Sequence, residues 1–103
     1  MAFESGTFDA HLVAAAGEDA VLLAELRACF VDSLSQQVDL LARARCDANW
    51  LVAAARLRGL GASFHSAELV SLAEEALDGA PGDPVILRKL TGFSTAFYAP
   101  VQA

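Results

Sequence analysis

The side chains with the most obvious chemistry in this sequence are two histidines, His11 and His65, and two cysteines, Cys29 and Cys46. Neither histidine belongs to a Ser/His/Asp set, and no cluster has the spacing of metal ligands, so surface or packing roles are expected. The cysteines fit neither a CxxC motif nor a zinc spacing, which favours reduced thiols in or near the core. The segment Gly79-Ala80-Pro81-Gly82 is a turn, because no Lys-Ser or Lys-Thr pair follows it. We therefore expect no enzymatic activity, metal or cofactor.

Arginines are gathered in one short stretch of the chain, which contains Arg43, Arg45, Arg56 and Arg58. The whole chain nevertheless carries a net charge of −6, which opposes the phosphate backbone of nucleic acid. We therefore expect no nucleic-acid binding, and a local basic patch that can engage an acidic protein partner.

Apolar residues recur at helical spacing in five segments separated by short loops, and no segment reads convincingly as a strand. The expected helices run from Thr7 to Ala16, from Glu18 to Arg45, from Asp47 or Asn49 to Phe64, from Ser66 to Leu77 and from Pro84 to about residue 98. Thr7 and Asp83 are the expected caps of the first and last helices, and either Asp47 or Asn49 caps the third.

Four of these segments are amphipathic and must bury their apolar faces against one another. We expect an all-α fold: an antiparallel four-helix bundle in up-down-up-down order, with the short N-terminal helix packed across one end. We expect the chain to form a single domain, 1–103, with an ordered part at 7–98 and frayed tails at 1–6 and 99–103. The residues expected to share one core are Leu26, Phe30, Leu57, Phe64, Leu72, Leu90 and Phe93.

No apolar run approaches the ~20 residues needed to cross a bilayer, so no membrane span is expected. The first residues lack the basic start and long apolar run of a secretory signal. These features predict a cytoplasmic protein.

The third helix has an unusual outward face. With Leu57 at the centre of the buried side and a turn of about 100° per residue, Ala55 points almost directly away from the core. The other residues expected on this outward side are Val52, Gly59, Ala62 and Ser66. Arg56 and Arg58 flank this strip, which lacks the long charged side chains of a solvated helix face. It is either a docking surface, a strip covered by another helix of the chain, or an ordinary alanine-rich surface.

The same helix carries a family resemblance, in the residues Ala-Ala-Ala55-Arg-Leu57-Arg58-Gly59-Leu-Gly-Ala-Ser-Phe64. Histidine-phosphotransfer (HPt) domains have a histidine, any residue, leucine, lysine or arginine, glycine, then small residues and an apolar one. Spaced apolar residues between Phe8 and Phe30 are similar to the family's N-terminal pattern, and the resemblance covers residues 7 to about 77. There are two departures. Ala55 stands where the family has its phosphate-accepting histidine, and His65 stands where a glycine is usual.

The resemblance implies a place in two-component signalling, where other members relay phosphate between receiver-domain aspartates. In that family the receiver docks on the histidine-bearing face. Ala55 then marks the vacated acceptor, Arg58 the phosphoryl clamp and Gly59 the clearance for the partner. The expected function is therefore a non-phosphorylatable HPt-like module that binds a response-regulator receiver domain or a histidine-kinase element.

Two alternatives remain open. His65 or His11 could carry phosphate in a changed geometry. However, His65 lies about 15 Å along the helix axis from Ala55, at 1.5 Å per residue, and cannot replace it in the same docked pose. Alternatively, the outward strip is a homodimer face and the protein is a structural helical dimerisation domain. The expected oligomeric state is a monomer or a weak homodimer.

Overall fold

The computed structural model describes residues 10–98, and all regular secondary structure within that range is helical, as predicted. A helical segment at 10–16 is followed by α2 (Ala20–Arg43), α3 (Asp47–Ser63), α4 (Ala67–Leu77) and α5 (Pro84–Tyr98). The expected cap Thr7 and the expected tails at 1–6 and 99–103 lie outside the described residues.

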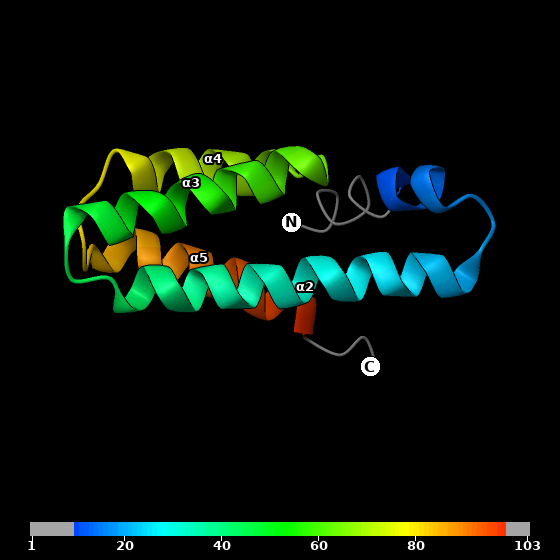
Figure 1. The fold of residues 1–103 in the computed structure, drawn as a ribbon, viewed down its shortest axis with the longest axis horizontal. Helices are drawn as coiled ribbons and strands as arrows, with labels where there is room; N and C mark the ends of the chain where they lie inside the picture. The colour runs from blue at the N-terminus through cyan, green and yellow to red at the C-terminus, as the bar shows by residue number, and fades with distance from the viewer. Residues whose placement is uncertain (1–9, 99–103) are drawn as a thin grey trace.

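Successive helices from α2 to α5 run in opposite directions along the long axis of the molecule (Figure 1). Helix α2 packs against α3 and α5, and α4 packs against the same two helices. With 24 residues, α2 is the longest helix, and its first turns extend past the end where α3 leads into α4. The helical segment 10–16 lies beside those first turns (Figure 1).

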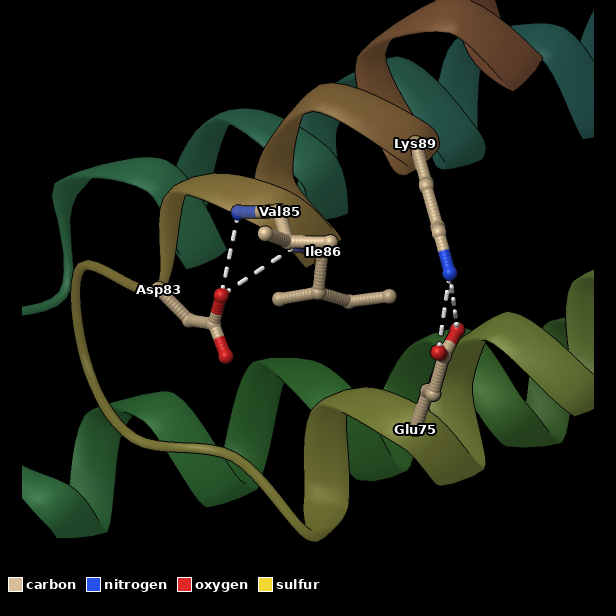
Figure 2. Close-up of polar contacts among 5 residues, drawn as sticks. All are labelled: Glu75, Asp83, Val85, Ile86 and Lys89. Atoms are coloured by element: carbon tan, nitrogen blue, oxygen red, sulfur yellow. Dashed lines mark hydrogen bonds and ion pairs between the residues drawn. The ribbon is translucent and has the colours of Figure 1, made fainter.

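The start of α5 is capped by the residue that the sequence predicts. Asp83 Oδ1 accepts hydrogen bonds from the backbone N–H groups of Val85 and Ile86, at 3.0 and 3.4 Å (Figure 2). Lys89 Nζ lies 2.9 Å from Glu75 Oε2, which links α5 to α4. Both contacts hold the last helix in place after the turn that follows α4.

The start of α3 differs from the prediction. Cys46 occupies the N-cap position and its side chain makes no capping hydrogen bond, whereas Asp47 is already the first helical residue. Asp47 therefore acts through its charge near the positive helix terminus rather than as a cap. The prediction that Asp47 or Asn49 caps this helix is therefore wrong.

The predicted core residues do meet in one apolar cluster. Phe30, Leu57, Leu90 and Phe93 are buried in it, and the three others pack against it while partly exposed: Leu26, Phe64 and Leu72.

Helices α3 and α4 approach closely at Gly61. A Cβ atom added at Gly61 would lie 2.9 Å from the backbone nitrogen of Val70 and 3.1 Å from Leu69 Cβ. Trp50 adds a directional contact, because its Nε1 donates a hydrogen bond of 2.7 Å to the buried carbonyl oxygen of Ala76. These two contacts define which side of α3 is covered by α4.

Two glycines of α3 provide a matched test of this packing. Gly61→Ala should lower the free energy of unfolding by about 1–3 kcal/mol, because the new methyl group meets the backbone of α4. Gly59→Ala should raise it by about 0.5–1 kcal/mol, because no atom lies within 4 Å of its added Cβ and alanine favours a helix. Urea unfolding of both variants measures the difference. Equal effects at the two positions would contradict the close approach of α3 and α4.

Candidate functional site

Helix α3 presents small side chains to the solvent along its outer side. Leu57 is fully buried and Ala55 is exposed, which confirms the predicted facing of the helix. Val52 is 49% exposed, and Gly59 and Ala62 are exposed as well. We call these four residues, Val52, Ala55, Gly59 and Ala62, the α3 crest. The buried residues of α3, which packs against α2 and α4, lie on the other side of the helix: Trp50, Ala53, Ala54, Leu57 and Gly61.

Ser66 does not belong to this surface, which corrects the sequence prediction. Its side chain is only 1% exposed, and its hydroxyl oxygen accepts a hydrogen bond of 3.3 Å from the backbone nitrogen of Leu69. The prediction was wrong because α3 ends at Ser63, so its periodicity does not continue to Ser66. Ser66 is instead the N-cap of α4.

The turn between α3 and α4 holds His65 in a left-handed backbone conformation, with φ at 59°. His65 N–H donates to Ala62 O at 3.3 Å and Ser66 N–H donates to Gly61 O at 2.8 Å. These are the two hydrogen bonds of a Schellman turn, in which glycine usually takes the left-handed position. His65 therefore adopts a left-handed backbone conformation that is unfavourable for a residue with a Cβ atom. The HPt pattern has a glycine at this position.

The two histidines come together at this turn, a proximity that the sequence did not predict. The rings of His11 and His65 stack with their centres 4.6 Å apart and their planes inclined by 19°. They lie beside a cavity of about 460 Å³ whose walls include Leu26 and Phe64. This site is at the α3–α4 turn, beyond the end of the crest.

The two arginines that flank the crest differ in their surroundings. Arg58, the position of the phosphoryl clamp in the resemblance, pairs with Glu74 of α4 through Nε and Oε2 at 3.1 Å. Both side chains are about half exposed, so this ion pair is weak and can exchange with a partner's charge. Arg56 lies on the opposite flank, toward α2.

A groove of about 350 Å³ runs between α2 and α3 on the side of Arg56. Its walls include Leu40, Gln37 and Arg43 of α2, together with Val52 and Arg56 of α3. Leu40 is 45% exposed. Sequence reasoning missed Gln37 and Leu40, although an exposed leucine outside the apolar stripe of α2 was an available signal.

The cysteines are both free and exposed, so the expectation that they lie in or near the core is wrong. Cys29 lies on the outer side of α2, next to the buried Phe30, and Cys46 occupies the α2–α3 turn. Among residues 10–98, no three His, Cys, Asp or Glu side chains gather in a way that could hold a metal ion.

Within the described part of the chain, no helix combines the length and apolar character needed to cross a membrane. Comparison with protein-family models gives no match, and comparisons with curated proteins and with solved structures also find no similar protein.

Proposed function

We propose that this chain is a non-phosphorylatable HPt-like module that binds a receiver domain or a histidine-kinase element of a two-component system in the cytoplasm. On this proposal α2 to α5 form an antiparallel up-down-up-down bundle, and the segment 10–16 packs across one end. The alternating helix directions and the contacts of α2 and α4 with both α3 and α5 support it.

The observation that carries the proposal is the α3 crest. An exposed helix face normally carries long charged side chains, whereas this one carries Ala55, Gly59 and Ala62 beside a half-exposed Val52. Gly59 has nothing within 4 Å of its Cβ position, so packing inside the chain does not require it. A mid-helix glycine destabilises a helix by about 1 kcal/mol relative to alanine. Close approach of a partner's backbone would explain why a glycine is present at this position.

The crest can bind but cannot accept phosphate. Transfer from a phosphoaspartate needs a nitrogen lone pair that attacks phosphorus while the acyl-phosphate P–O bond breaks. The Ala55 methyl group has no lone pair. His65 lies in the α3–α4 turn beyond the end of the crest, and its ring is stacked on that of His11. A receiver seated on the crest therefore meets no nucleophile.

Charge substitutions on the crest test the docking surface. Gly59→Glu and Ala62→Glu should leave the domain folded, because both positions are exposed, and should abolish binding to a purified receiver domain. The added side chain brings a clash and an unpaired charge into the interface. Ala96→Glu, at an exposed position of α5, is the matched control and should bind like the parent.

The measurement is surface plasmon resonance against a panel of purified receiver domains and histidine-kinase dimerisation domains, with circular dichroism to check folding. If Gly59→Glu and Ala62→Glu both bind a partner as the parent does, the docking surface lies elsewhere. If the parent binds no member of the panel and sediments as a dimer that the crest variants dissociate, the crest is a homodimer face.

Restoring the nucleophile tests the lost chemistry. Ala55→His should fold, because the position is exposed and helix propensity falls by only a few tenths of a kcal/mol. The variant should gain an acid-labile, base-stable phosphate from the receiver that binds it, whereas the parent should gain none. Radiolabelled phosphate transfer followed by acid and base treatment measures both.

Phosphate on His65 or His11 of the parent would contradict the proposal, because the chain would then be an active phosphocarrier. A folded Ala55→His variant that still binds the receiver but takes no phosphate would show that the receiver does not present its aspartate to the crest.

A further inference from the structure

We propose that Glu74 of α4 masks Arg58, so that an anionic group of a partner on the α3 crest must compete with Glu74 for the guanidinium. The inference rests on the proposed docking function and adds an internal competitor to it. Glu74 then has an autoinhibitory role, because its carboxylate lowers the affinity of the crest for an acidic partner.

Arg58 borders the α3 crest on the side of α4. It lies three residues after Ala55 and four residues before Ala62, and residues at these spacings are neighbours on a helix surface. Its side chain is 56% exposed, so part of the guanidinium is open to solvent although α4 is close. A partner that covers Ala55 and Ala62 therefore comes within reach of Arg58.

The contact with Glu74 uses only part of the guanidinium. A hydrogen bond of 3.1 Å joins Arg58 Nε to Glu74 Oε2, and among residues 10–98 no hydrogen bond engages the Nη groups of Arg58. A guanidinium has five N–H donors, and pairing with a carboxylate through two of them is the stronger arrangement. Arg58 therefore keeps donors for a second anion.

The Arg58–Glu74 pair is exposed enough to exchange its partner. Glu74 is 52% exposed, and water and dissolved salt screen such ion pairs, which are therefore weak. A partner's anion can displace Glu74, or it can share the guanidinium with Glu74 and be repelled by the second negative charge. In both cases the Glu74 carboxylate weakens binding of the partner's anion.

The two arginines beside the crest differ in this respect. Arg56 forms no ion pair with another residue of the described range, whereas Arg58 is paired. Arg56 lies toward α2, on the opposite flank from Glu74. Masking by Glu74 is therefore expected at Arg58 and not at Arg56, which serves as an internal control.

The chain also provides a matched control one residue away. Glu75 of α4 pairs with Lys89 of α5, with 2.9 Å between Lys89 Nζ and Glu75 Oε2, and both side chains are about half exposed (Figure 2). Glu74→Gln and Glu75→Gln each remove one negative charge from α4 and break one ion pair between helices. Only Glu74→Gln releases the arginine beside the crest.

Inorganic phosphate tests the masking without assuming a receiver. The arginine Nε–H signals of the labelled domain are followed by NMR while phosphate is added at constant ionic strength. In Glu74→Gln, half-saturation of the Arg58 signal should need about two- to fivefold less phosphate than in the parent, the range that an exposed ion pair allows. Glu75→Gln should match the parent, and the Arg56 signal should respond alike in all three proteins.

Receiver binding gives a second readout, in the double-mutant form that isolates one pairwise interaction. A receiver that binds the parent should bind Glu74→Gln about two- to fivefold more tightly, and should bind Glu75→Gln as it binds the parent. In an Arg58→Ala background, Glu74→Gln should have no effect, because the cation that it masks is absent. A general effect of lost negative charge would strengthen binding in both backgrounds.

Two results of the phosphate titration would overturn the proposal: equal half-saturation in Glu74→Gln and Glu75→Gln, or an Arg58 signal that phosphate shifts in none of the proteins. The receiver panel decides the docking function separately. A receiver that binds the crest and does not distinguish Glu74→Gln from the parent overturns the masking and keeps the function. Arg58 unmasked toward phosphate by Glu74→Gln, with no receiver bound, overturns the function and keeps the masking.

Discussion

The close packing of α3 on α4 determines which residues of α3 face outward. Gly61 brings the backbones of the two helices together, and the Trp50 indole donates its hydrogen bond to a carbonyl oxygen of α4. With Leu57 buried on this side, the 3.6-residue repeat directs Ala55 and Gly59 to the solvent. The crest, its two flanking arginines and the groove all follow from this orientation.

Several local costs in the described residues lie on or near this surface. Gly59 weakens the middle of a helix, the Gln37 oxygen is buried without a partner, and His65 adopts a backbone conformation suited to glycine. Proteins tend to break local stability rules where function requires it. The partner proposed for the crest would account for Gly59, because its backbone could approach the helix closely there. His65 lies beyond the crest, so a partner on the crest does not account for its backbone strain. Its ring stacks on that of His11.

Sequence reasoning predicted the elements and the orientation of α3, because apolar spacing and capping residues such as Asp83 act locally. It failed at Ser66 because a helical period was extended across a turn. It placed the cysteines in or near the core although both are exposed. The groove, the Arg58–Glu74 pair and the stacked histidines join residues from separate helices, and no local pattern encodes such contacts.

The central claim is that the α3 crest is the surface a signalling partner covers. A two-dimensional ¹H–¹⁵N spectrum of the labelled domain, titrated with an unlabelled receiver domain, tests it most directly. The account predicts that the largest amide shifts fall on Val52, Ala55, Gly59 and Ala62, with smaller changes on α5. Shifts centred on α5, or a spectrum unchanged by every receiver in the panel, would contradict it.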